Sequence, residues 1–290
     1  MKCTWFIDKQ YAGMTIHAFL KQQQFSRRFL KKLKVNGGKV FVNDEISFFR
    51  YVLKEGETLR LLAPEEKRPE TLQPKQMELD IVYEDDAILI LNKRAGLPTI
   101  PSIRDGNQSL ASGILAYYDE KNLPYTVHIV TRLDRDTSGL VLVAKHRHSH
   151  ALLAEQQKEH KIKRIYTAIV EGHVKEAQGT ITSRIMRKPD SIIERIVHPN
   201  GQIAITHFWV KEVHSTYSKI EVELETGRTH QIRVHFAHKG HALLGDTLYG
   251  NAHALINRQA LHCQYLAFSH PLTGIEMTFT ACLPEDLQRL

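Results

Sequence analysis

The sequence predicts an α+β protein in which a small N-terminal α/β domain precedes a larger domain with a mixed, largely antiparallel β-sheet and flanking helices. Three observations predict this fold. Short strand patterns outnumber helical patterns in the later part of the chain, the net charge of +7 lies wholly within residues 1–62, and a polar segment with three prolines follows them. We therefore expect domains at residues 1–62 and 79–290, joined by a linker at residues 63–78.

The composition of the 290-residue chain excludes several classes of protein. Hydrophobic residues make up 42% and charged residues 24%, which is typical of a folded protein and unlike a disordered one. The sequence contains no apolar run long enough to cross a membrane and no signal-peptide pattern at its start. Cys3, Cys263 and Cys282 form no CxxC pair, so neither a disulfide framework nor a thiolate zinc site is expected. We expect a cytoplasmic protein that does not associate with membranes.

The N-terminal domain is predicted to contain a strongly basic helix. Residues 21–39 hold seven Lys or Arg residues and no acidic residue. Ser26 can cap a helix that begins at Arg27, and the Gly37-Gly38 pair can end it. Apolar residues at helical spacing form one face of this helix: Phe25, Phe29, Leu30 and Leu33. Its other flanks carry cations: Arg27, Arg28, Lys31, Lys32 and Lys34.

This basic helix has two interpretations. Most charged helix faces are only solvated, but here no acidic residue relieves the repulsion between the cations. A phosphate backbone would neutralise them, which favours nucleic-acid binding.

Strand patterns run through both predicted domains. In the first, residues 40–42 and 59–62 have strand character, and residues 43–44 and 54–57 have turn character. The larger domain has strand patterns at residues 81–83, 87–91, 140–144, 166–170, 220–224 and 276–279. Helical patterns lie at residues 110–118, 148–157 and 229–239.

Three stretches of the larger domain carry chemically informative residues. The first is RLDRDTSGL at residues 132–140, which taken alone is a turn between two apolar runs. The second is KRIYTAIVEG at residues 163–172, which taken alone is a strand with one tyrosine. The third is GRTHQIRVHF at residues 227–236, where Thr229 could cap a helix and place Arg233 in its first turn.

Together these stretches resemble the pseudouridine synthases that modify large-subunit ribosomal RNA and some tRNAs. Further segments resemble that family in order along the chain: residues 79–85, 92–98, 245–250, 258–262, 270–271 and 283–284. The resemblance covers roughly residues 79–285. The N-terminal domain is similar to the S-four-like RNA-binding module, through its Ser-Arg helix start, the VFVN hairpin at residues 40–43 and GETL at residues 56–59.

The resemblance implies a reaction and roles for five residues. Pseudouridine formation breaks the N-glycosidic bond of a uridine and re-forms it to a ring carbon without redox chemistry, so no cofactor is expected. Asp134 would be the nucleophile, and Arg233 would keep its carboxylate ionised. Tyr166 would stack on the flipped base. Arg132 would move into the space that the base vacates, and Arg228 would contact RNA.

Three positions qualify this assignment. Asp136 lies in the same loop as Asp134 and is its local rival, although the family pattern leaves that position variable. Thr131 stands where the family usually has His or Gly, and Arg94 stands where it usually has Pro. Neither departure touches the proposed nucleophile.

The chain's seventeen histidines raise the question of a metal site. His146, His148 and His150 alternate, and His235, His238 and His241 are three residues apart, but no set of carboxylates or thiolates accompanies them. We expect no metal, and we expect these histidines to face RNA or solvent.

The sequence thus predicts a monomeric enzyme whose partner is RNA. The family resemblance favours large-subunit ribosomal RNA, and tRNA remains an alternative. A second function would be a non-catalytic RNA-binding or ribosome-assembly protein. A third would be a nucleoside glycosidase, which usually needs two carboxylates or a metal at the bond.

Overall fold

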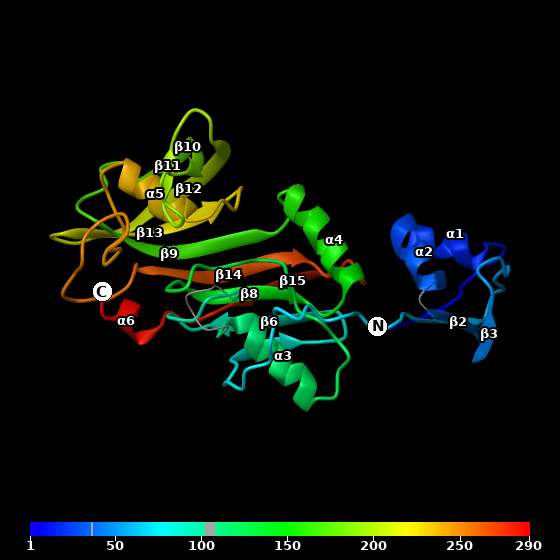
Figure 1. Ribbon diagram of the computed structural model, residues 1–290. Coiled ribbons are helices and arrows are strands. Elements are labelled where there is room, and N and C mark those ends of the chain that lie inside the picture. Colours follow the sequence, from blue (N-terminus) through cyan, green and yellow to red (C-terminus); the bar gives the residue numbers. More distant parts are fainter. Residues whose placement is uncertain (36, 102–107) are drawn as a thin grey trace.

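The computed structural model describes residues 1–35, 37–101 and 108–290 (Figure 1). Two large hydrophobic clusters lie within these ranges, one built from residues between Met1 and Ala63 and the other from residues between Met77 and Ala281, and two small clusters accompany the second. No helix within the described ranges is long and apolar enough to span a bilayer.

The N-terminal part is a four-stranded antiparallel sheet with two helices. Its elements are β1 Lys2–Phe6, α1 Ile16–Gln22, α2 Arg27–Val35, β2 Lys39–Val42, β3 Glu45–Ser47 and β4 Thr58–Leu62, and the strand order is β1-β4-β2-β3. The Ser26 hydroxyl accepts a hydrogen bond from the Phe29 N–H at 3.1 Å, so the predicted cap is confirmed. Asn43 and Asp44 form a turn with φ of 50° and 70° between β2 and β3. The sequence analysis missed β1, α1 and β3.

An eleven-stranded sheet dominates the rest of the molecule, which confirms the α+β fold class. Its strands are β5 Ile81–Glu84, β6 Ile88–Lys93, β7 His128–Ile129, β8 Ser138–Ala144, β9 Lys163–Glu171, β10 Gln178–Arg187, β11 Arg195–Val197, β12 Gln202–Val213, β13 Tyr217–Leu224, β14 Leu261–Ser269 and β15 Glu276–Thr280. The main order is β11-β10-β12-β13-β9-β14-β8-β6-β5. Every pairing among the described strands is antiparallel except that of β14 with β8.

Four helices accompany this sheet: α3 Leu110–Glu120, α4 Arg147–Lys158, α5 Gln231–His238 and α6 Glu285–Gln288. Helix α5 packs against β10, β11 and β12, and α4 packs against β7 and β8 at the side that faces the N-terminal part (Figure 1). The predicted cap at Thr229 was wrong, because α5 begins at Gln231 and its N-cap is His230. The Gln231 side chain accepts a hydrogen bond from the Arg228 N–H at 2.9 Å and closes the preceding turn.

Three of the strands that the sequence analysis missed in this sheet carry many polar residues. Strand β10 buries only Ile181 and Ile185, strand β12 alternates buried with half-buried positions over residues 204–208, and the two carry Thr, Ser, Arg and His among them. Strand β14 contains His262, Cys263 and Gln264. These strands are stabilised by their neighbours in the sheet rather than by a continuous apolar run.

The expectation that the histidines lie at the surface was wrong for three of them. His146, His148 and His235 are at most 4% exposed. Burial lowers the pKa of His146 to about 3 and those of His148 and His235 to about 4. These rings are therefore neutral, and His146 caps α4 by accepting a hydrogen bond from the Ser149 N–H.

The segment predicted as a linker lies against the larger part of the molecule. The Glu66 carboxylate accepts a hydrogen bond from the Arg147 N–H at 2.8 Å and lies 2.9 Å from His128 Nε2. Arg68 donates to the carbonyl oxygens of Leu123 and Tyr125. The N-terminal part also contacts the larger part directly, because the Phe25 ring stacks on the His148 ring with 3.7 Å between ring centroids.

We expect Glu66→Gln to destabilise the protein in a pH-dependent way. Burial acts to raise the pKa of Glu66, but the contacts with His128 and Arg147 lower it to about 2. Because the ordinary Glu value is about 4.3, this stabilisation is complete above that pH and disappears as the pH falls toward 2. Urea unfolding should show a loss of about 1–3 kcal/mol at pH 7 and a smaller loss near pH 3. An equal loss at both pH values would contradict this assignment.

Candidate active site

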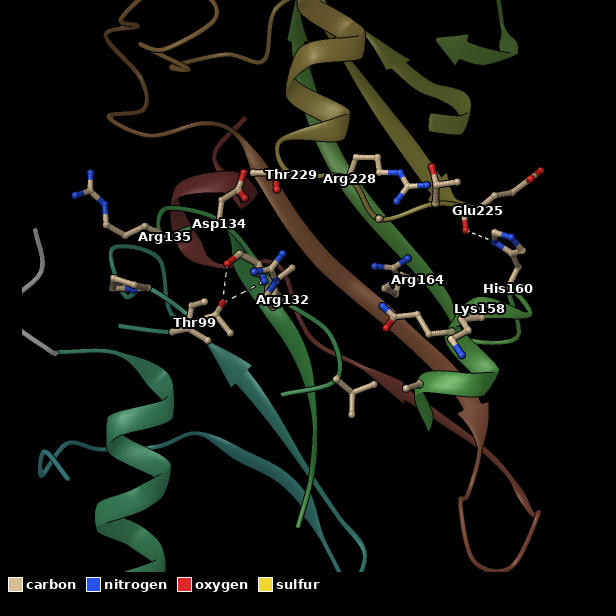
Figure 2. Close-up of a pocket in the computed structure, with 18 residues that line it drawn as sticks. Thr99, Arg132, Asp134, Arg135, Lys158, His160, Arg164, Glu225, Arg228 and Thr229 are labelled. Atoms are coloured by element: carbon tan, nitrogen blue, oxygen red, sulfur yellow. Dashed lines mark hydrogen bonds between the residues drawn. The ribbon is translucent and has the colours of Figure 1, made fainter. Parts of the chain in front are cut away.

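A cavity with two lobes opens where the loop before β8, the strand β9 and the loop before α5 meet (Figure 2). The outer lobe has a volume of about 690 Å³ and the inner lobe about 60 Å³. Both lobes are lined by Arg132, Leu133, Asp134, Arg164, Gly227 and Arg228.

The Asp134 loop and strand β9 meet because β14 runs between β8 and β9. Cys263 of β14 pairs with Tyr166 on one side and with Gly139 on the other. Gly139 has φ of +113°, and a Cβ at this position would lie 2.2 Å from the Cys263 carbonyl oxygen. A residue with a side chain would therefore push the two strands apart, which explains the glycine at the second position of β8.

The backbone on both sides of Asp134 is held by buried polar groups. Thr99 Oγ1 donates to the Leu133 carbonyl at 2.6 Å, and Lys93 Nζ donates to the Arg135 carbonyl at 2.9 Å. The Thr131 hydroxyl accepts from the Leu142 N–H at 2.9 Å and thereby anchors the start of the loop to β8. The Asp134 side chain itself remains 24% exposed and faces the cavity.

Arg233 joins two carboxylates at the inner end of the cavity. Its Nη1 donates to Asp134 Oδ2 at 3.2 Å, as predicted. A tighter contact was not predicted: Nε and Nη2 form a bidentate pair with Asp246 at 2.7 and 2.8 Å. Burial acts to lower the pKa of Arg233, but the two carboxylates more than offset this and raise it. Arg233 therefore stays charged beside Asp134.

His230 lies on the other side of Asp134. Its Nε2 is 3.8 Å from Asp134 Oδ2, and its Nδ1 is 2.7 Å from the Tyr249 hydroxyl. Burial lowers the pKa of His230 despite the nearby Asp134, so its ring is mostly neutral at pH 7. The left-handed backbone of His230, with φ of 57°, places the ring here just before α5 begins.

Tyr166 contributes an aromatic surface to the inner lobe. Its side chain is 3% exposed, and apolar residues line the lobe beside it: Leu133, Leu224, Ile232 and Leu261. Burial raises the pKa of Tyr166, so its hydroxyl is protonated at neutral pH. The inner lobe thus combines an aromatic ring and four apolar side chains with the paired Asp134 and Arg233.

The other predicted site residues fall into two groups. Arg132 and Arg228 are exposed side chains at the cavity mouth, close to the predicted catalytic trio of Asp134, Tyr166 and Arg233. The cations of α2 belong to the N-terminal part and do not line the cavity. Within that helix, Arg27, Lys31 and Lys34 are exposed, whereas the side chains of Arg28 and Lys32 lie outside the described part of the structure.

Four residues of the cavity region were missed by the sequence analysis: Lys93, Arg164, His230 and Asp246. Each lies inside a segment that the sequence analysis had singled out, so a signal for its importance was present. The sequence did not indicate that these segments converge on Asp134.

Lys93 is buried beneath the Asp134 loop. Its Nζ donates to the carbonyl oxygens of Arg94, Leu97 and Arg135 at 2.8–2.9 Å, which satisfies all three ammonium hydrogens. Burial lowers the pKa of Lys93 to about 7, and the charges of Asp134 and Asp136 oppose this shift.

We expect Lys93→Met to destabilise the protein by about 2–4 kcal/mol, because it leaves three carbonyl oxygens without a donor. Turnover should fall as well, since the Arg135 carbonyl loses its anchor. Urea unfolding and initial rates would measure both effects. The same substitution at the exposed Lys175 is the control. A Lys93→Met variant as stable and active as the wild type would refute this role.

Comparison with known proteins identifies the family. The model of the RNA pseudouridylate synthase family matches residues 87–238, a span that includes Asp134, Tyr166 and Arg233. The chain belongs to this family. It is therefore an RNA pseudouridine synthase, an isomerase that acts on RNA.

Similar proteins support this pseudouridine synthase assignment over almost the whole chain. "Uncharacterized RNA pseudouridine synthase YjbO" of Bacillus subtilis (strain 168) is 47% identical over 277 residues, covering 96% of this chain and 98% of the relative. "Ribosomal large subunit pseudouridine synthase D" of Neisseria meningitidis (serogroup A, strain Z2491) is 38% identical, and the match covers 98% of this chain and 79% of the relative. The protein of that name in Escherichia coli (strain K12) is 38% identical, and the match covers 75% of this chain and 71% of the relative.

Solved structures agree on the fold of this synthase. The human RNA pseudouridylate synthase domain containing 1 superposes with a TM-score of 0.59 at 23% identity, covering 76% of this chain and 87% of its own. The human RNA pseudouridylate synthase domain containing 4 gives the same TM-score at 19% identity, and the match covers 72% of this chain and 90% of that structure.

Proposed function

We propose that this protein converts one or a few uridines of large-subunit ribosomal RNA into pseudouridine, with Asp134 as the nucleophile. The observation that carries the proposal is the position of the Asp134 carboxylate. It lies 3.2 Å from the Arg233 guanidinium, at the entrance of an inner lobe walled by Tyr166. Ribosomal RNA is favoured because relatives at 38% identity are named for the large ribosomal subunit.

The chemistry requires an electron pair but no external reagent. The bond from ribose C1′ to uracil N1 breaks, a bond from C1′ to C5 forms, N1 gains a proton and C5 loses one. An ionised carboxylate supplies the electron pair at the reacting centre. The Arg233 guanidinium lies 3.2 Å from the Asp134 carboxylate, and the apolar side chains around Tyr166 limit the competing attack of water.

The position of Asp134 within a cavity supports the proposal that the target base leaves the RNA helix. A stacked uridine cannot reach Asp134, so it must be turned out into the cavity. The Tyr166 ring then provides a stacking surface, worth about 1–3 kcal/mol. We assign Arg132, which is exposed at the mouth, to the space that the base leaves.

The N-terminal part would bind RNA outside the cavity. Helix α2 exposes Arg27, Lys31 and Lys34 and has no acidic residue in its first turn. We assign residues 1–62 to an S-four-like RNA-binding domain, residues 63–78 to the linker and residues 79–290 to the catalytic domain. One chain supplies the whole cavity, so a monomer suffices, and a ribosomal substrate would place the enzyme in the cytoplasm.

Pseudouridine mapping of ribosomal and transfer RNA tests this function. Cells that lack the gene should lose one or a few pseudouridines in large-subunit ribosomal RNA, and the wild-type gene should restore them. If a tRNA pseudouridine is lost instead, the substrate is tRNA rather than ribosomal RNA, and the assigned reaction is unchanged. No lost site in either pool, with RNA binding intact, would favour a role in docking or ribosome assembly.

A further inference from the structure

Arg164 is a buried cation that the reaction as described does not use. It lies on β9 and is 6% exposed, and it lines both lobes of the cavity. Its Nε is buried without a hydrogen-bond partner. Within the described ranges its guanidinium forms no ion pair with a carboxylate. A cation this deeply buried, with an unpartnered Nε, is suited to bind an anion.

The neighbouring carboxylates already have partners. Glu225 pairs with His207 at 2.6 Å, Glu223 pairs with Lys163 at 3.2 Å, and Asp134 pairs with Arg233 at 3.2 Å. The positive charge of Arg164 influences the site. It acts to lower the pKa of Tyr166, although burial has the larger, opposite effect. The anion that suits Arg164 would therefore enter the cavity from outside.

The backbone around Arg164 holds its side chain in place. A Cβ at Gly227 would lie 3.1 Å from Nη1 and 3.4 Å from Nη2, so the glycine backbone passes close to the guanidinium. Figure 2 shows the Arg164 side chain among the residues that line the outer lobe, and Arg164 lines the inner lobe as well. A fixed guanidinium directed into a cavity is suited to bidentate binding of a planar or tetrahedral oxyanion.

The spacing of Arg164 from Tyr166 indicates which anion this is. The two residues are two positions apart on β9 and both are buried, so they share one face of the strand with about 6.6 Å between their Cα atoms. If the base stacks on Tyr166, its sugar-phosphate backbone lies on the side of the outer lobe. Arg132, Lys158 and Arg228 add positive charge there.

We propose that Arg164 binds the phosphate that flanks the target uridine and so fixes the depth of the flipped nucleotide. A phosphate matches the uncompensated unit charge, whereas a neutral uracil carbonyl would leave it unbalanced. This proposal rests on the proposed base flipping and deepens it. It assigns Arg164 to substrate binding, with Gly227 as the residue that positions it.

A short RNA with a single target uridine allows a direct test. Each flanking phosphate is replaced in turn by a neutral methylphosphonate, and KM and kcat are measured for the wild type and for Arg164→Gln. With the natural RNA, we expect Arg164→Gln to raise KM about 10- to 100-fold. With wild type, one methylphosphonate position should raise KM by a similar factor. With Arg164→Gln, that same methylphosphonate should have little further effect, because the two changes remove one contact.

Two controls make the result specific. Lys211→Gln removes an exposed cation, paired with Glu221, that does not line the cavity, and it should retain the full methylphosphonate effect. Arg164→Lys should restore part of the binding, since it returns the charge without the bidentate fork. The melting temperature of each variant reports folding separately.

The outcomes that overturn the proposal are distinct from those that overturn the proposed function. If no flanking methylphosphonate weakens wild-type binding, Arg164 binds no phosphate, whatever the stability of its variants. Equal methylphosphonate effects in wild type and Arg164→Gln lead to the same conclusion. The test uses whichever RNA the wild-type enzyme modifies, so an error in the assignment to ribosomal RNA leaves it valid.

Discussion

Replacing Asp134 with Asn is expected to lower kcat for pseudouridine formation by about 10⁴-fold or more, with little change in RNA affinity. The amide keeps the size of the side chain but removes the negative charge that, in the proposed mechanism, attacks the substrate. The fold should be preserved, because the Asp134 side chain is partly exposed and its loop is anchored through Leu133 and Arg135.

Asp136→Asn is the matched control for this experiment. Asp136 lies two residues from Asp134 in the same loop and pairs with the exposed Arg135. It lines neither lobe of the cavity, so its variant should retain activity within a few-fold of the wild type. Release of tritium from RNA labelled at uridine C5 gives the rate, and filter binding gives the affinity. If the Asp134→Asn variant is active and the Asp136→Asn variant is inactive, Asp136 rather than Asp134 is the nucleophile.

Asp246→Ala is expected to have the largest effect on stability, a loss of about 3–5 kcal/mol. Asp246 is 1% exposed and accepts two hydrogen bonds from Arg233 and one from the Leu248 N–H. Its removal leaves the buried guanidinium with only the 3.2 Å contact to Asp134. Breaking one side of a buried charge pair costs more than the pair contributes, because the remaining charge is left without compensation.

Urea unfolding measures this loss, with Asp44→Ala as the control. Asp44 pairs with Arg60 at the surface, where its side chain is 85% exposed, so its removal should cost no more than about 1 kcal/mol. A cost below about 1 kcal/mol for Asp246→Ala would show that Arg233 does not depend on Asp246. The activity of Asp246→Ala should also fall, because Arg233 is no longer held from both sides.

The two predictions concern one arrangement. Asp246 fixes Arg233, and Arg233 in turn lies beside Asp134. Asp134, the proposed nucleophile, is therefore the more exposed end of a charge network whose other end is buried. Such a network places a guanidinium beside the Asp134 carboxylate without enclosing that carboxylate completely.

Local features of the fold were readable from the sequence. Ser26 as a cap, the Asn43-Asp44 turn and the alternating or apolar strands β5, β6, β8 and β9 all depend on residues that are neighbours in the chain. The catalytic candidates Asp134, Tyr166 and Arg233 were found through family motifs, and the structure places all three around one cavity.

Contacts between distant segments could not be read in this way. Nothing in the polar sequences of β10, β12 and β14 indicates a strand until their neighbours are present. The pairing of Arg233 with Asp246, the neutral buried histidines and the unpartnered Arg164 depend on where β14 runs and on how the loop before α5 lies across β9. Short-range patterns encode local conformation, whereas ion pairing and desolvation depend on distances between segments that are far apart in the chain.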